Sequence, residues 1–224
     1  MPVFFVMYMR KVMLLFFLLS NSLLAQDEQI VTDEHYLEDE LYISLSYQQL
    51  MNLPDEISQT GFSYSLSLGF IKDLPLNSDR NRGLALGLGY NLNVHYFNVE
   101  DIGLEEDDST VKNNKVALSM IEMPIEFRFR NSSPVKYKFW RFYPGIKLSY
   151  SFYDSNNIKQ SEDFDVSEVI QINDFQYGIS LSAGYNNWNF YTYYGISTLF
   201  NESESYPNEI EANEIKLGII FYLL

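Results

Sequence analysis

The sequence contains no cysteine among its 224 residues. This absence excludes a disulfide scaffold, a metal site built from thiolates and a lipid anchor on a processed N-terminal cysteine. Basic residues are also scarce, because 15 Lys and Arg stand against 30 Asp and Glu, and the formal net charge is −15. A chain this acidic lacks the positive surface that nucleic acids bind, so we expect no nucleic-acid partner.

The mean hydropathy is only −0.16, which is too low for a bundle of transmembrane helices. It does not exclude a transmembrane β-barrel, whose strands are apolar on one face only. Aromatic residues, in contrast, are abundant, with 18 Tyr and 17 Phe. Amphipathic rings suit the two interfaces of a membrane, where one end of the ring lies in hydrocarbon and the other in water.

The N-terminal region has the layout of a secretory signal. Arg10 and Lys11 precede the apolar run VMLLFFLLSNSLLAQ, and Ala25 offers a small residue for cleavage. The natural start is Met1 or Met9. An uncleaved anchor helix is the alternative, but the run is shorter than the ~20 residues that a spanning helix needs. We therefore predict a signal peptide over residues 1–25, an acidic, flexible periplasmic lead over 26–40 and a barrel over 41–224.

The stretch from Ile121 to Tyr150 shows most clearly the pattern that organises the chain. In its first half, large apolar residues alternate with polar or charged ones, as the run IEMPIEFRFR shows. A strand sends successive side chains to opposite faces, so one face is apolar and the other carries both signs of charge. After a turn predicted near 130–137, the run WRFYPGIKLSY repeats the alternation. We interpret the two halves as a β-hairpin.

The same alternation occurs in six further stretches, at 41–48, 62–71, 83–96, 171–185, 188–200 and 214–224. Together with the hairpin they make eight strands, and single-chain bacterial barrels have an even number. We predict an all-β fold: an eight-stranded antiparallel up-and-down transmembrane β-barrel with its apolar face toward lipid. The alternative is a soluble β-sandwich or lipocalin-like barrel, which would expose a large apolar band to water.

The connections predict the orientation of the barrel. Those near 50–60, 98–114, 153–170 and 201–212 are long, and those near 72–82, 130–137 and 186–187 are short on average. Long loops normally face the outside and short turns the periplasm. We therefore predict an integral outer-membrane protein with both termini in the periplasm. Aromatic residues are expected to form an outer girdle of Tyr47, Phe62, Tyr96, Tyr150, Phe175 and Phe200 and an inner girdle of Phe70, Trp140, Tyr185, Trp188 and Phe221.

An eight-stranded barrel is just wide enough to be filled by its own side chains. Buried charges are tolerated only when they are paired, so we predict a salt-bridge network in the lumen; a proton or ion path is the alternative. The predicted members are Glu122, Glu126, Arg128, Arg130, Arg141, Lys147 and Lys216. We expect no catalytic residue, cofactor or metal. An esterase or acyltransferase site at His95, the only histidine in the predicted barrel, is the enzymatic alternative.

The two ends of the predicted barrel carry opposite charge. The outer loops are rich in Asp and Glu, which we interpret as a solvated surface; divalent-cation binding is the alternative. Basic residues collect at the periplasmic end instead. The predicted docking rim for an acidic periplasmic partner consists of Lys72, Arg80, Arg82, Lys136 and Lys138.

The runs IEMPIEFRFRNSSP and YKFWRFYPGIKLSYSF resemble the PorT family of outer-membrane barrels from Bacteroidetes. The resemblance implies a non-enzymatic role in the type IX secretion system, which exports proteins across the outer membrane and, in gliding species, motility adhesins. It implies contacts with outer-membrane lipid and with other secretion components, and it brings no catalytic residues. The alternative function is that of a general structural or adhesive barrel whose outer loops bind a ligand.

Overall fold

The computed structural model describes residues 39–53, 57–59, 61–99, 111–131, 139–157, 172–200 and 212–223. The strands in these residues are β1 (Asp39–Met51), β2 (Ile57–Gln59), β3 (Tyr64–Pro75), β4 (Arg82–Val99), β5 (Val111–Arg130), β6 (Trp140–Asn157), β7 (Phe175–Tyr185), β8 (Trp188–Thr198) and β9 (Asn213–Leu223). None of the described segments forms a helix long and apolar enough to cross a membrane.

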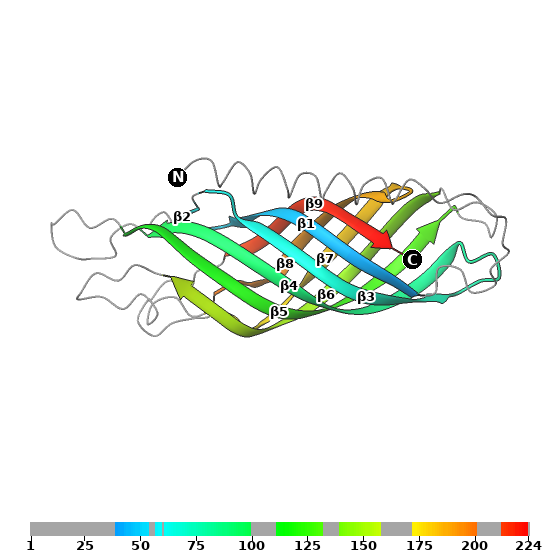
Figure 1. Cartoon of the computed structure of the whole chain (residues 1–224), viewed down its shortest axis with the longest axis horizontal. Coiled ribbons are helices and arrows are strands. Elements are labelled where there is room, and N and C mark those ends of the chain that lie inside the picture. Colours follow the sequence, from blue (N-terminus) through cyan, green and yellow to red (C-terminus); the bar gives the residue numbers. More distant parts are fainter. Residues whose placement is uncertain are drawn as a thin grey trace, which may run out of the picture. The chain divides into compact units, whose positions relative to one another are not determined.

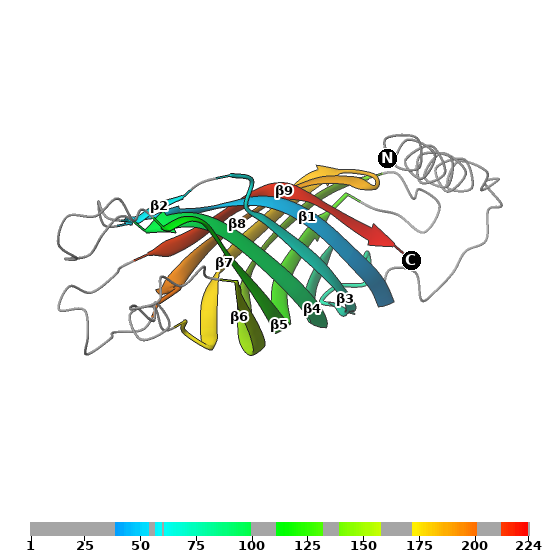
Figure 2. The same cartoon turned by 60° about the vertical axis from the view of Figure 1, so that its left-hand side comes forward.

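Eight of the described strands, β1 and β3 to β9, form a closed antiparallel wall. Each of them pairs with the next along the chain, and β9 returns to pair with β1, as the red and blue strands of Figure 1 show. The turned view in Figure 2 shows the same tilted strands side by side. Closure removes the free edges of the sheet, and the predicted eight-stranded up-and-down barrel is confirmed.

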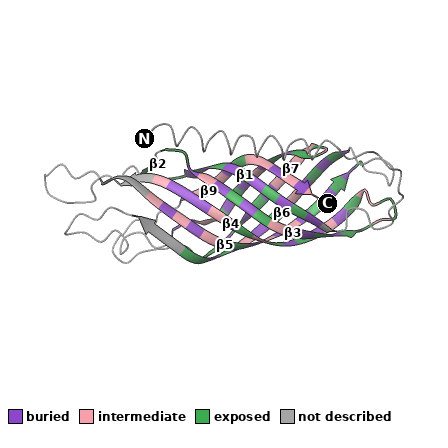
Figure 3. Cartoon of the chain, viewed as in Figure 1, coloured by how far each residue is buried: buried purple, intermediate pink, exposed green. Residues whose placement is uncertain are grey.

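Exposure alternates along the strands as predicted. On β1, the side chains of Leu41, Ile43 and Leu45 are exposed, whereas Tyr42 and Ser44 are buried. The bands of buried and exposed residues in Figure 3 follow the strands in this way. The barrel is therefore apolar on its outer surface and largely polar inside, which is the reverse of a soluble domain.

Local sequence explains two features of the wall. Pro124 has no N–H for the β-ladder, and the β4–β5 pairing omits the positions opposite it. Gly87 lies beside the proline ring, where an added Cβ would come within 2.8 Å of the proline Cγ. At the β7–β8 turn, Asn186 adopts a positive φ of 56°, which two-residue hairpins require and Asn tolerates. The predicted turn at 186–187 is confirmed.

Several predicted boundaries are wrong because strand pairing continues into segments whose sequence does not alternate. β1 begins at Asp39, inside the predicted lead. β3 continues to Pro75, so the turn covers 76–81 rather than 72–82. β4, β5 and β6 extend into the loops predicted at 98–114 and 153–170, since backbone pairing needs no particular side chain. β8 differs in the opposite direction, because it ends at Thr198, two residues before its predicted end.

The loop predicted near 50–60 contains the short strand β2, which pairs with the end of β4. Gln59 on β2 holds this segment to β1: its Oε1 accepts from the Leu50 N–H at 2.7 Å, and its Nε2 donates to the Gln48 carbonyl at 3.0 Å. The three-residue segment ISQ is too short to show alternation, which is why the sequence did not reveal it.

Two shifts of register change which side chains face outward. Phe200, predicted in the outer girdle, is buried, because the β8–β9 register shifts between Tyr194 and Thr198. A second shift in the β5–β6 pairing lies opposite Tyr153, and Phe152 and Tyr153 are both exposed. A β-bulge breaks strict alternation in this way.

The predicted signal peptide, the acidic outer loops and residues 26–38 of the lead lie outside the described residues.

Candidate functional site: the lumen and its basic rim

All seven side chains predicted for the lumen network are buried. The structure adds three acidic residues that the prediction did not include: Glu40, Asp73 and Glu214. Among the described residues, the buried basic side chains are Arg128, Arg130, Arg141, Lys147 and Lys216, and the buried acidic ones are Glu40, Asp73, Glu122, Glu126 and Glu214. Five positive charges thus face five negative charges, and the described lumen carries no net charge while His95 is neutral.

The first cluster lies toward the end of the barrel that holds the 76–81 turn. Arg128 is fully buried and pairs with Glu40; its Nη2 also lies 3.3 Å from Glu126 Oε2. Arg130 pairs with Asp73. Arg141 Nη2 lies 3.8 Å from Glu40 Oε1. β1, β3, β5 and β6 are therefore tied together across the lumen.

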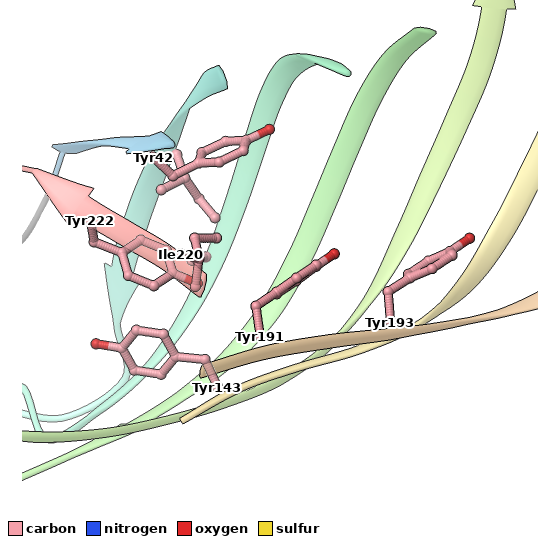
Figure 4. Close-up of a cluster of buried hydrophobic side chains, with 8 residues drawn as sticks. Tyr42, Tyr143, Tyr191, Tyr193, Ile220 and Tyr222 are labelled. Atoms are coloured by element: carbon pink, nitrogen blue, oxygen red, sulfur yellow. The ribbon is translucent and has the colours of Figure 1, made fainter. Parts of the chain in front are cut away.

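Aromatic rings enclose the guanidinium of Arg128. Its Cζ lies 4.7 Å from the ring centroid of Tyr143 and 5.2 Å from that of Tyr222, which are cation–π distances. The two rings meet edge to face with centroids 5.5 Å apart. The Tyr222 hydroxyl donates to Glu126 Oε1 at 3.0 Å. Figure 4 shows these tyrosines with Tyr42 of β1 and with Tyr191 and Tyr193 of β8.

The second cluster is centred on Glu122 of β5. Its Oε1 accepts from the Tyr42 hydroxyl at 2.7 Å, and its Oε2 accepts from Lys147 Nζ at 3.0 Å and from Ser67 Oγ at 3.2 Å. Lys147 Nζ also lies 5.0 Å from the ring centroid of Tyr191. One carboxylate therefore joins residues of β1, β3 and β6.

The third cluster is centred on Lys216 of β9. Its Nζ donates to Asn93 Oδ1 at 2.9 Å and lies 3.0 Å from Glu214 Oε2. His95 Nε2 lies 3.3 Å from the carboxylate oxygen Oε1 of Glu214. On the same side of β5 as Glu122, the apolar side chains of Leu118 and Met120 are fully buried.

The three clusters together make the interior a packed plug. Each buried ion lies within 4.0 Å of an opposite charge, and tyrosine rings cover several of the cations. Such pairing offsets the cost of removing charges from water. In the described part of the chain, no group of three His, Asp or Glu residues is placed to hold a metal ion.

The predicted docking rim is described in part. Lys72 and Arg82 are exposed, and Arg80 is half-buried in the 76–81 turn. These three residues lie at one end of the barrel, as predicted. Lys136 and Lys138 lie outside the described residues. The Arg80 carbonyl accepts from Arg130 Nε, which joins the rim to the first lumen cluster.

Comparison with family models matches residues 24–201 to the outer membrane protein beta-barrel domain. The match covers every strand of the barrel except β9. The comparison with curated proteins finds no match.

Proposed function

We propose that this protein, which belongs to the outer membrane protein beta-barrel domain family, supports export by the type IX secretion system. In this proposal it is not an enzyme and not a channel. It acts through contacts that its rims and outer surface make with lipid and with other secretion components. In gliding species, the same role extends to the export of motility adhesins.

The observation that carries this proposal is the charge-balanced plug in the lumen. A transport path needs continuous water, and paired ions with tyrosine rings occupy the space where water would lie. A barrel whose lumen is filled therefore acts through its rims and its outer surface. The likeness of IEMPIEFRFRNSSP and YKFWRFYPGIKLSYSF to the PorT family favours type IX secretion as the function of the barrel.

The basic rim is the surface that we propose for a protein partner. Arg80 lies in the 76–81 turn and Lys72 lies on the part of β3 that leads into this turn, while the chain as a whole is strongly acidic. An acidic periplasmic protein would be steered to this end and repelled elsewhere. The alternative function, a structural or adhesive barrel, would place its ligand at the opposite loops.

Deletion of the gene tests the proposal, with cargo proteins of the secretion system measured in the medium and in the periplasm. We expect cargo to accumulate in the periplasm and the full-length chain to restore its release. Lys72→Glu combined with Arg80→Glu should restore release poorly, although the barrel still folds. Lys115→Glu, at the other end of the barrel, is the matched control and should restore it fully. Normal secretion in the deletion strain would refute the proposal and leave the adhesive alternative.

A further inference from the structure

A pocket of about 590 Å³ opens at the rim that holds the 76–81 turn. Its lining includes the exposed aromatic residues Phe129, Trp140 and Phe142, together with Ala183 of β7. Phe129, Trp140 and Phe142 alternate with the buried Arg130 and Arg141, so their side chains point to the outer surface of the barrel. Ala183 shares this face, because it pairs directly with Phe142 and follows the buried Ser182. The pocket has the size of a small-molecule site, and its outer side is apolar.

Ala183 explains why the surface is hollow at this point. It pairs with Phe142 on one side and Phe190 on the other, both of which carry exposed rings. A methyl group between two aromatic neighbours leaves a depression on the apolar face. An acyl chain can fill this depression, because both are apolar.

The polar side of the pocket is cationic. Arg82 is exposed, shares the outward face of β4 and lines the pocket with Asn81 and Asn131. Within the described residues, its guanidinium has no ion-pair partner, whereas the five buried cations are all paired. The backbone around it is fixed, because the Arg130 N–H donates to the Asn81 carbonyl at 2.9 Å and the Asn131 N–H to the Trp140 carbonyl at 3.2 Å.

We propose that this pocket binds a phosphate-bearing membrane lipid, with the phosphate at Arg82 and one acyl chain along Phe129, Phe142 and Ala183. Arginine binds phosphate oxygens in a bidentate manner, and aromatic rings at the rim lie at the headgroup level. An acidic peptide would satisfy Arg82 but would leave the aromatic surface without an apolar partner. The lipid satisfies both halves of the pocket.

Trp140 lines the pocket and reports on its occupant. The sequence has two tryptophans, so Trp188→Phe leaves Trp140 as the sole tryptophan, which is excited selectively over the tyrosines. The full-length Trp188→Phe protein in non-ionic detergent is titrated with an anionic phospholipid whose acyl chains are brominated and therefore quench tryptophan. Brominated diacylglycerol, which lacks phosphate, is the parallel titrant. We expect the phospholipid to reach half-maximal quenching at a concentration at least five-fold lower.

Two variants separate the contributions to binding. Arg82→Gln should abolish the preference for phosphate, whereas Lys115→Gln, at the far rim, should keep it. Ala183→Leu should weaken binding of both lipids by filling the depression, and Thr192→Leu on the same outer surface should not. Equal quenching by the two lipids, or a preference that survives Arg82→Gln, would reduce the pocket to ordinary lipid contact and overturn the proposal. Displacement of the lipid by inorganic phosphate alone, or by an acidic peptide, would assign the site to those ligands instead.

Discussion

Arg128 and Glu40 form an ion pair that is completely buried and joins residues 88 positions apart. The pair ties the first strand of the barrel to β5 across the lumen. Removing one member leaves an uncompensated charge, which costs about 3–5 kcal/mol in a buried site. We therefore predict that Glu40→Gln lowers the free energy of unfolding by about this amount, measured by urea unfolding in lipid vesicles with tryptophan fluorescence.

The matched variants make this prediction specific to charge. Arg128→Met alone should be comparably destabilising, while Glu40→Met combined with Arg128→Met should cost clearly less than the sum of the single changes. Asp79→Asn, in the exposed 76–81 turn, should change stability by less than about 0.5 kcal/mol. Additive effects of Glu40 and Arg128 would show that the two side chains do not depend on each other.

Gly69 and Gly89 make room for the Tyr42 side chain, which crosses over this glycine pair to reach Glu122. A Cβ at Gly89 would overlap the Tyr42 hydroxyl and come within 2.9 Å of the Leu68 carbonyl. Overpacking of this kind typically costs about 1–3 kcal/mol. We predict that Gly89→Ala lowers the unfolding free energy by this amount in the same urea assay.

Tyr42→Phe provides the test of that explanation. Removing the hydroxyl relieves the overlap, so Gly89→Ala should cost less in the Tyr42→Phe background than in the natural chain. Gly195→Ala, where the nearest atom lies 3.3 Å from an added Cβ, is the control with the smaller expected effect. An equal cost of Gly89→Ala in both backgrounds would exclude Tyr42 as the cause.

The packed lumen predicts that the full-length protein does not conduct ions. In planar bilayers with verified insertion, we expect no stable current steps. Replacing Tyr143 and Tyr222 together by Ala removes the two rings beside Arg128 and should produce intermittent steps. Steady open currents of porin size from the natural chain would contradict a filled lumen and revive the ion-path interpretation.

The charge balance of the predicted lumen network shows how much of the candidate site could be predicted from the sequence. The predicted network held five basic residues and only two acidic ones, Glu122 and Glu126. Because buried charges must be paired, this imbalance implied three missing acids. The structure supplies Glu40, Asp73 and Glu214, and all three share the inward face of their strands. Glu40 and Asp73 escaped the prediction because they were assigned to a flexible lead and to a turn.

The remaining differences come from features that alternation does not encode. Tyr143 and Tyr222 are buried on the inward face, but their stacking on Arg128 depends on how strands distant in sequence meet across the lumen. The register shifts that bury Phe200 and expose Tyr153 depend on cross-strand pairing. The strand pattern was therefore readable from local periodicity, whereas contacts across the barrel required its closure.

A membrane-spanning barrel requires lipid around its apolar outer face, and an arginine on that face tests whether lipid is there. Leu88 lies near the middle of β4 with 64% of its surface exposed, and Leu76 lies in the rim turn with 65% exposed. An arginine at the midplane of a lipid bilayer costs about 2–4 kcal/mol, and at most about 1 kcal/mol near the interface.

Unfolding free energies of Leu88→Arg and Leu76→Arg, compared in lipid vesicles, therefore decide the matter. We predict a loss of about 2–4 kcal/mol for Leu88→Arg and a loss of less than about 1 kcal/mol for Leu76→Arg. Equal and negligible losses at the two positions would mean that water bathes this face, and would contradict a membrane-spanning barrel.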